Sequence, residues 1–341
     1  LEGGNATMYR ARYPQTRQLE NGPWAEKSAP PLDYVPANTS LIYHADKLLA
    51  LTETGLPYEL LLGDLSSMGV YDFNGRLKSS MTAHPKIDPQ TGELIFFGSS
   101  GFSSTINYHV ASREGVLVHS TQFELLGAPV FMHDFHVTAT RSIFWDCPVV
   151  FDRSVAEKYG GVGYRWNPDN GTRVGVLSRY GQGSEIKWFD VELGNVSHTV
   201  NAYDDPNDPA AVILDAVFSP HFWVNSPVEF RPEGKIVRFR LNTASGNITK
   251  EVVLETSTEF PRINERNLCY PYRYTYSVEN PPAVPVGGES IVKTDFTTGD
   301  SKVYQLSDGV LTGELIFVPD NTSSEEDEGW LIGFAHDSVN N

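Results

Sequence analysis

The stretch PVFMHDFHVTAT, residues 129–140, carries two histidines three residues apart, His133 and His136. Imidazole can act as an acid or base near neutral pH, and it is a common ligand for divalent metals. The residues that follow, VTATRSIFWDCPVVFD, are rich in Val, Thr, Ile and aromatic side chains and predict a strand. Positions i and i+3 of a strand face opposite sides, so we expect only one of these histidines to point into a site.

Two further histidines have neighbours like those of His133. His84 lies in MTAHPKIDP and His198 in SHTVNAYDD, and each of the three adjoins a strand-like segment and a turn-forming residue. Neutral imidazoles that meet at one point would suit iron, zinc or copper. Any one of them taken singly is better interpreted as a structural or surface histidine, so a metal site requires a fold that brings all three together.

Three acids stand in apolar settings where an isolated charge would be costly. Glu53 follows KLLALT, Glu259 opens EFPRIN and Glu314 lies in LTGELIFVPD. A buried carboxylate can hold the second ring nitrogen of a metal-ligating imidazole and offset part of the metal charge. The alternative is that these are strand-edge acids that face water, and the pattern alone leaves both interpretations open.

The elements that must position these residues are mostly strands. DPQTGELIFFG (88–98), LNTASGNITKEVVLE (241–255) and TDFTTGDSKVYQL (294–306) each contain D/N-x-x-[ST]-G, in which the glycine suits a hairpin loop. Helical periodicity is weak and limited to residues 152–161 and 204–217. Many short strands with regular turns over 341 residues favour an all-β propeller, in which inner strands converge on one axis.

The composition limits the partners and the compartment. A net charge of −17 disfavours nucleic acid or an anionic lipid surface as a partner, while it leaves room for a local peripheral membrane contact. The two cysteines, Cys147 and Cys269, imply no disulfide framework. No apolar run approaches the roughly 18 residues of a transmembrane helix. We expect a protein that is soluble or peripheral to a membrane, in the cytoplasm or a plastid, and leave its oligomeric state open.

Six separated motifs resemble the carotenoid cleavage oxygenases and occur in the order of that family. They are LLALTETGLPYEL, MTAHPKIDPQTGELIFFG, APVFMHDFHVTAT, SHTVNAYDD, EFPRIN, and GELIFVPD followed by EEDEGWL. The resemblance implies a seven-bladed β-propeller with capping loops and short helices, a single domain over residues 1–341 that lacks parts of the family fold at both ends. It also implies Fe2+ as the cofactor, held by four histidines. Three of these would be His84, His133 and His198, and the acids that orient the ligand imidazoles would be Glu53, Glu259 and Glu314.

The resemblance further implies a non-haem Fe2+ dioxygenase that uses O2 to cleave a conjugated C=C bond of a carotenoid or apocarotenoid, an apolar polyene, to aldehyde or ketone products. Stilbene-cleaving members resemble this chain in ANTSLIYHADKLLAL, but they typically place Lys just before the glutamate that matches Glu53, where this chain has Thr52. We therefore favour a polyene over a phenolic stilbene. The alternatives are a stilbene-cleaving dioxygenase, an isomerase or ester-cleaving enzyme of the same fold, and a metal-free propeller that binds a ligand or partner.

The fourth histidine of the family pattern is missing from this sequence. The only histidine after Glu314 is His336, in GFAHDS, where relatives usually have a tyrosine or similar residue on an ordinary strand. We therefore expect that His336 is not a ligand and that the fourth ligand lies outside these residues. The chain by itself is then expected to be inactive.

Overall fold

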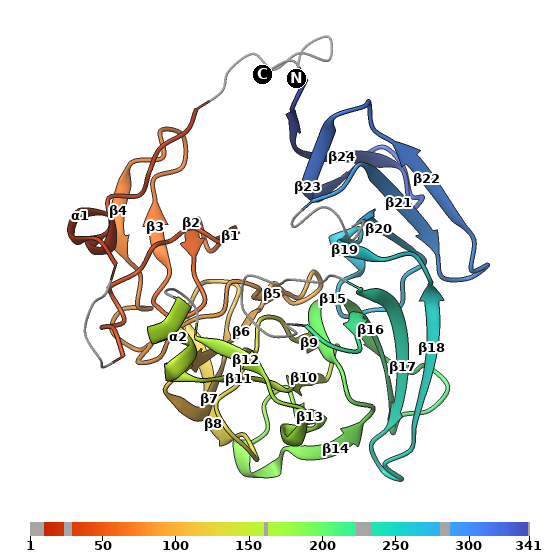
Figure 1. The fold of residues 1–341 in the computed structure, drawn as a ribbon, viewed down its shortest axis with the longest axis horizontal. Helices are drawn as coiled ribbons and strands as arrows, with labels where there is room; N and C mark the ends of the chain where they lie inside the picture. Colours follow the sequence, from red (N-terminus) through yellow and green to blue (C-terminus); the bar gives the residue numbers. More distant parts are fainter. Residues whose placement is uncertain (1–9, 24–28, 160–162, 223–232, 280–286, 340–341) are drawn as a thin grey trace.

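The computed structural model describes residues 10–23, 29–159, 163–222, 233–279 and 287–339, which form an open ring of β-sheets (Figure 1). Five sheets within these residues have four antiparallel strands each, and we call them blades 1 to 5 in chain order. A two-stranded sheet, β23–β24, follows blade 5, and a second pair, β11–β12, branches from the chain of blade 3.

Within each blade the strands follow one another in chain order from the innermost outward. Blade 1 contains β1 (Ser40–His44), β2 (Lys47–Leu51), β3 (Tyr58–Leu60) and β4 (Ser67–Val70). Blade 2 contains β5 (Lys86–Ile87), β6 (Leu94–Ser100), β7 (Ser103–Ala111) and β8 (Leu117–Glu124). Blade 3 contains β9 (His136–Val137), β10 (Arg141–Asp146), β13 (Thr172–Ser178) and β14 (Lys187–Val191). Blade 4 contains β15 (Asn195–Asp204), β16 (Ala211–Ser219), β17 (Lys235–Asn242) and β18 (Ile248–Leu254). Blade 5 contains β19 (Thr258–Arg262), β20 (Tyr274–Glu279), β21 (Ser290–Asp295) and β22 (Ser301–Gln305).

The elements outside the five blades are two short helices, three 3₁₀ turns and four strands within the described residues. They are α1 (Arg17–Asn21), β11 (Val149–Phe151), α2 (Arg153–Tyr159), β12 (Tyr164–Trp166), the 3₁₀ turns η1 (Pro168–Asn170), η2 (Gly183–Glu185) and η3 (Glu265–Asn267), β23 (Val310–Pro319) and β24 (Gly329–Asp337). Helix α2 confirms the helix predicted within residues 152–161. The helix predicted within 204–217 is wrong, because strand β16 covers much of that segment and is buried along its whole length. A short, fully buried apolar run has no periodicity that separates a strand from a helix.

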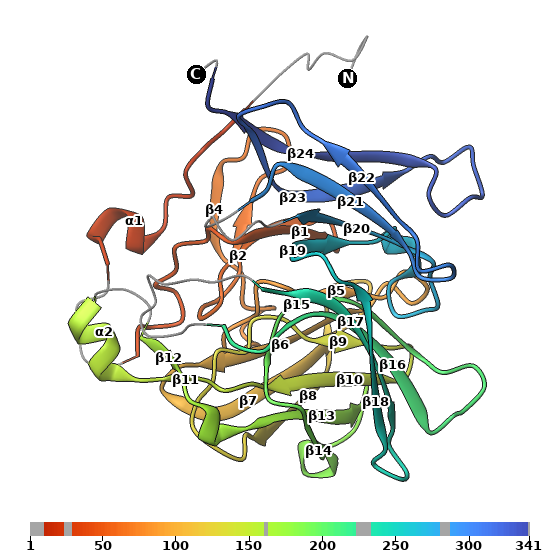
Figure 2. The same ribbon diagram turned by 45° about the vertical axis from the view of Figure 1, so that its right-hand side comes forward.

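The predicted class, an all-β propeller, is confirmed, and the described residues form five four-stranded blades, fewer than the seven of the predicted family fold. The five four-stranded blades already occupy residues 40–305, and the length described after them holds only the β23–β24 sheet. Figure 1 shows the inner strands around a common centre, with the arc open between blade 1 and the β23–β24 sheet, and Figure 2 shows the same blades from a second side. Apolar side chains are exposed at both ends of the arc, with Leu41 of β1 63% exposed and Trp330 of β24 58% exposed.

The three D/N-x-x-[ST]-G sequences form the hairpin loops that they predict. They join β5 to β6, β17 to β18 and β21 to β22. Gly92, Gly246 and Gly299 have φ angles of 74°, 75° and 77°. The amide of each glycine donates to the carbonyl oxygen of the Asp or Asn four residues earlier. Glycine enters this left-handed region without a Cβ penalty, so each loop can close tightly and set the register of its hairpin.

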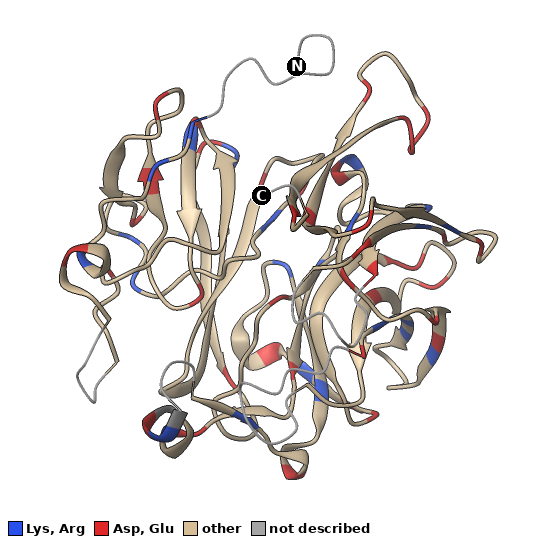
Figure 3. Ribbon diagram, turned by 45° about the horizontal axis from the view of Figure 1, so that its top comes forward, with Lys and Arg blue, Asp and Glu red and all other residues tan. Residues whose placement is uncertain are grey.

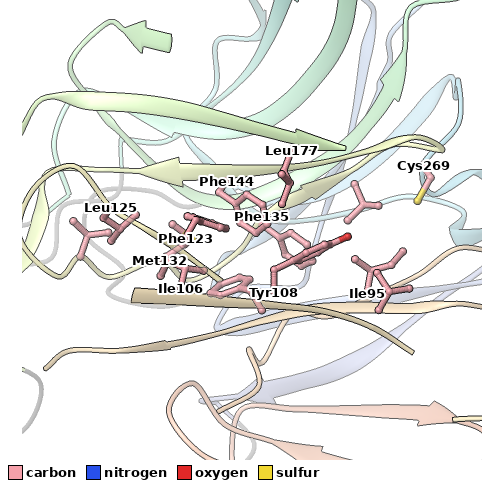
Figure 4. Packing of buried hydrophobic residues seen from close by; sticks show 14 of the residues in the cluster. Ile95, Ile106, Tyr108, Phe123, Leu125, Met132, Phe135, Phe144, Leu177 and Cys269 are labelled. Carbon is pink, nitrogen blue, oxygen red and sulfur yellow. The ribbon is translucent and has the colours of Figure 1, made fainter. Parts of the chain in front are cut away.

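The hydrophobic core lies between adjacent blades. Figure 4 shows the cluster that joins blade 2 to blade 3, in which Phe123 of β8 and Phe144 of β10 have ring centroids 4.8 Å apart. Phe135 stacks on Phe144 at a centroid distance of 5.7 Å. Because neighbouring blades cover both faces of an inner sheet, residues 94–97 of β6 are all 0% exposed and appear in the sequence as one apolar run.

Charged residues are spread over the ring. Figure 3 shows Asp and Glu on loops of several blades, with Lys and Arg interspersed among them. In the part of the chain that the structure describes, no helix combines the length and apolarity needed to cross a bilayer.

Two core histidines make the stability of this fold depend on pH. His109 is 7% exposed, and its ring nitrogens bond to the hydroxyls of Ser79 and Ser120. Burial lowers the pKa of His109 to about 4, and it lowers the pKa of His136, which is 1% exposed, to about 4 as well. An unfolded chain exposes both imidazoles, which then titrate near pH 6.5. The unfolded state therefore binds more protons than the native state between pH 6.5 and 4.

We expect the free energy of unfolding to fall as the pH is lowered from 6.5 to 4, by up to about 3 kcal/mol for each of these two histidines. Urea unfolding across this pH range measures the slope. His109→Gln should make the slope shallower by the share that His109 contributes, because Gln can still bond to a hydroxyl but does not titrate. His221→Gln is the control, since that side chain is 36% exposed and lies outside the core. An unchanged slope in His109→Gln would contradict the assignment.

Candidate metal centre

Three histidines from the inner edges of three blades converge on one point. His84 Nε2 lies 2.9 Å from His133 Nε2, and His133 Nε2 lies 3.1 Å from His198 Nε2. One ring nitrogen of each lies within 4.8 Å of the others, so all three could bind one metal ion. No other group of His, Cys, Asp and Glu among the described residues has this arrangement.

An irregularity in or beside an inner strand places each of these histidines. His84 lies in a bend just before β5, and His133 lies in the irregular segment before β9. His198 lies within β15, where the register with β16 shifts between Val196 and Thr199. Such a bulge re-aims a side chain out of the regular alternation, and the ring of His198 here meets that of His133.

The stretch with His133 and His136 differs from the strand predicted for it. Only His136 and Val137 form strand β9, so a strand that includes His133 is wrong. His136 lies in the core, where its Nε2 donates to the carbonyl oxygen of Asp215 at 2.8 Å and its Nδ1 accepts from the indole of Trp145 at 3.0 Å. The two histidines have different surroundings because the backbone is irregular between them, and strand parity is not the reason.

Two glutamates contact the outer nitrogens of the cluster. Glu53, in the turn after β2, places Oε1 2.8 Å from His133 Nδ1, although the N–H is not aligned for a hydrogen bond and the two atoms have no other partner among the described residues. Glu259 of β19 accepts from His198 Nδ1 at 2.7 Å, and the Ser197 hydroxyl donates to its other oxygen. A carboxylate in this position selects the tautomer in which Nε2 offers its lone pair.

Glu314 and His336 are placed differently. Glu314 of β23 is 33% exposed, and its Oε1 lies 3.0 Å from Arg262 Nη2. His336 is exposed on β24, opposite Leu311, and lies outside the group of three histidines. The described part of the chain thus brings together three of the predicted histidines and two of the predicted glutamates.

Burial and neighbouring charges set the protonation of the cluster. Burial, reinforced by the adjacent His133, holds the pKa of His84 well below its ordinary value. Burial also acts to lower the pKa of His198, but the Glu259 carboxylate outweighs it and raises that pKa. Burial alone would raise the pKa of Glu259, yet His198 lowers it. Metal binds neutral imidazole, so His84 is already in the binding form.

A buried ion pair beside the histidines was not predicted from the sequence. Asp134 follows His133 directly and is 4% exposed, and its Oδ1 accepts from Lys86 Nζ at 2.7 Å. Burial acts against ionisation, but the Lys86 ammonium lowers the pKa of Asp134. The acid is visible beside His133 in the sequence, but its partner is 48 residues away and no local pattern connects the two.

Aromatic rings border the cluster. Phe131 stacks on His133 at a centroid distance of 5.3 Å, and Phe260 lies 5.6 Å from the ring of His198. Phe260 has a φ of 54°, a left-handed conformation that costs a non-glycine residue about 1–3 kcal/mol, and its amide donates to Glu259 at 3.1 Å. Apolar ring faces beside the imidazoles suit a flat, conjugated molecule.

The donor set fits a divalent first-row metal. Three imidazole nitrogens approach one another, and carboxylates lie behind two of the rings to offset positive charge. The two cysteines contribute no thiolate, since both are buried elsewhere in the fold.

Comparisons with known proteins agree on the family. The family model described as "Retinal pigment epithelial membrane protein" matches residues 3–341. A carotenoid 9,10(9',10')-cleavage dioxygenase 1 of Arabidopsis thaliana is 34% identical over 322 residues, which are 88% of this chain and 59% of that relative. The chain therefore spans about three fifths of the length of this relative.

Solved structures with a similar fold come from the same family. A lignostilbene dioxygenase of Pseudomonas brassicacearum matches with a TM-score of 0.79 and 26% identity, covering 88% of this chain and 67% of that one. A cobalt-substituted apocarotenoid oxygenase of Synechocystis matches with a TM-score of 0.78 and 27% identity, covering 89% of this chain and 67% of that one. The chain belongs to the retinal pigment epithelial membrane protein family, which is the carotenoid cleavage oxygenase family.

Proposed function

We propose that this chain forms the metal-binding part of a non-haem Fe2+ dioxygenase, which cleaves a conjugated C=C bond of a carotenoid or apocarotenoid to aldehyde or ketone products. The observation that carries the proposal is the convergence of three imidazole Nε2 atoms with carboxylates behind two of the rings. Relatives named carotenoid cleavage dioxygenase and apocarotenoid oxygenase support the reaction class, and the cobalt-substituted relative supports a divalent metal.

The chain's own residues would hold and orient the metal. His84, His133 and His198 would bind it through Nε2, while Glu53 and Glu259 keep the Nδ1 proton on the two rings that they contact. A ferrous ion bound there would supply the redox chemistry with O2 that no amino-acid side chain provides. Glu314 remains part of the proposal as the third orienting acid. It would accept a hydrogen bond from a fourth imidazole that is not one of the three described histidines.

The aromatic surroundings would receive the substrate. Phe131 and Phe260 offer apolar ring faces beside the imidazoles. Thr52, which is 5% exposed and precedes Glu53, carries no charge that could pair with a phenolate. A polyene is therefore the preferred substrate, and a stilbene is the second candidate because of the likeness to a lignostilbene dioxygenase.

The proposal includes a closed, seven-bladed ring as one domain of the whole protein. The open arc and the apolar side chains exposed at both of its ends support this, as does the greater length of the relatives. In a closed ring each blade has two neighbours, so both of its apolar faces are covered.

Glu259→Gln is expected to weaken binding of Co2+ or Fe2+ by about 10–100-fold, as for other changes behind a metal ligand. Gln keeps the size of the side chain but lacks the charge that stabilises the Nδ1 proton of His198. Anaerobic titration calorimetry measures the affinity. Glu255→Gln is the matched control, because that carboxylate is 75% exposed and pairs with Lys235. Equal affinities in the two variants would mean that Glu259 is only a structural acid.

The reaction itself is tested by substrate preference and isotope labelling. For the whole protein, we expect a higher kcat/KM for an apocarotenal than for 4-hydroxystilbene, with label from 18O2 in both cleavage products. Thr52→Lys should raise kcat/KM for 4-hydroxystilbene by about 10-fold, since a hydrogen bond to a charged group contributes about 1.5–3 kcal/mol. Thr52→Gln, long but uncharged, should not. Efficient cleavage of the stilbene by the unchanged protein would favour the alternative substrate class.

A further inference from the structure

Asp134, next to His133 in the chain, accepts a complete set of hydrogen bonds. Its Oδ1 accepts from Lys86 Nζ at 2.7 Å and from the Phe135 amide at 2.8 Å. Its Oδ2 accepts from both the amide and the hydroxyl of Thr199, each at 2.8 Å. With a side chain only 3% exposed, the carboxylate is held entirely by protein donors.

The donors come from the segments that carry the other two histidines. Lys86 is two residues beyond His84 and starts β5 in blade 2, and Thr199 directly follows His198 in β15 of blade 4. Asp134 itself follows His133 ahead of blade 3. One carboxylate therefore connects three blades within two residues of each converging imidazole.

A second connection is weaker and joins fewer segments. The Thr82 hydroxyl donates to the carbonyl oxygen of His133 and accepts from the amide of His84, both at 3.1 Å. These are neutral bonds between two of the three segments. The bonds of Asp134 are charge-assisted and shorter, and charge-assisted bonds are roughly twice as strong as neutral ones.

The charge of Asp134 also matters for a cation at the cluster. The Lys86 side chain is only 14% exposed, so its ammonium is poorly screened by solvent. Without Asp134, this positive charge would stand unpaired two residues from a metal-binding imidazole. A divalent cation would then have to bind against it.

We infer that Asp134 is a positioning residue, which holds the three histidine segments in register and neutralises Lys86 so that a divalent metal can bind. This inference rests on the proposed metal function. Asp134 acts through the histidines and contacts neither metal nor substrate. Its role differs from those of Glu53 and Glu259, which contact individual rings.

The decisive measurement is Co2+ affinity, together with the visible absorption of bound Co2+, in purified protein. Asp134→Asn should lower the affinity by about 10–100-fold and change the absorption bands, because Asn has one acceptor oxygen and cannot accept from both Lys86 and Thr199 as the carboxylate does. Adding Lys86→Met to Asp134→Asn should recover part of the affinity, since it removes the unpaired ammonium. A general loss of stability predicts no such recovery.

Asp215→Asn is the matched control. Asp215 is 0% exposed and binds Arg238 through two hydrogen bonds of 2.8 Å, so it is another buried ion pair, and it contacts none of the three histidines of the cluster. This variant should lower thermal stability but keep the Co2+ affinity of the unchanged protein. Wild-type affinity and absorption in Asp134→Asn, or an equal loss in Asp215→Asn, would overturn the inference.

A metal-free measurement separates this inference from the proposed function. In protein labelled with 15N-histidine, Asp134→Asn should shift the ring resonances of His84 and His198 but not that of His119 in blade 2, which bonds to the Gly181 carbonyl oxygen of the β13–β14 connection. If the unchanged protein fails to bind Co2+, the metal function is wrong. These shifts alone then decide the role of Asp134, and unshifted resonances reject it.

Discussion

His133→Ala should lower the affinity for Co2+ or Fe2+ by at least about 100-fold, beyond the range of changes behind a ligand. His133 is the central ring, since its Nε2 lies 2.9 Å from that of His84 and 3.1 Å from that of His198. Its loss would leave only two imidazoles at the site, and the Glu53 carboxylate would lose its partner. Metal per chain after dialysis, measured by mass spectrometry, reports the effect.

His119→Gln is the control for this change. His119 of β8 bonds through Nε2 to the Gly181 carbonyl oxygen at 3.0 Å, a contact that Gln can replace. Its metal content should equal that of the unchanged protein. One tightly bound metal per chain in His133→Ala would show that the ion is held elsewhere.

Arg179→Met should reduce the free energy of unfolding by roughly 3–5 kcal/mol, the typical cost of removing one partner from a buried ion pair. Arg179 follows β13 in blade 3 and is 4% exposed, and its Nη1 lies 2.7 Å from Oδ2 of Asp88, which is 0% exposed. Asp88 lies in the β5–β6 loop, so this contact fastens blade 2 to blade 3. Without the guanidinium, the Asp88 carboxylate would be buried beside Met and lose its charge partner.

Urea unfolding at neutral pH measures this loss, with Lys235→Met as its surface counterpart. Lys235 and Glu255 form an ion pair in which the side chains are 44% and 75% exposed. Exposed pairs contribute about 0–1 kcal/mol, so Lys235→Met should change stability little. Similar effects of the two substitutions would contradict the view that Arg179 joins the blades.

Local signals in the sequence predicted local structure well. The D/N-x-x-[ST]-G loops form because an Asp or Asn and a Gly within five residues determine the turn. The segment at 204–217 was misassigned because β16 is sandwiched between two blades, which removes the alternation that identifies a strand. The number of blades could not be counted for a related reason, since the boundaries of each blade depend on packing between distant segments.

In the candidate site too, the features that depend on contacts between distant segments could not be predicted from local sequence patterns. A family resemblance, and not their spacing, indicated His84, His133 and His198, because no periodicity connects residues in three different blades. The pairing of Asp134 with Lys86 remained hidden, although the acid adjoins His133 in the sequence. The contact between Glu314 and Arg262 could not be predicted from the sequence either, because it depends on how β23 packs against β19.

The origin of the three imidazoles in separate blades has a kinetic consequence. The rings that meet are 49 and 65 residues apart along the chain. Closing such long loops costs entropy before any contact compensates for it, and folds rich in distant contacts form slowly. An unfolded chain thus holds these three histidines far apart, so we expect a metal ion to bind all three only after blades 2, 3 and 4 have docked. From then on it stabilises the finished structure by an amount that grows with the ratio of free metal concentration to Kd.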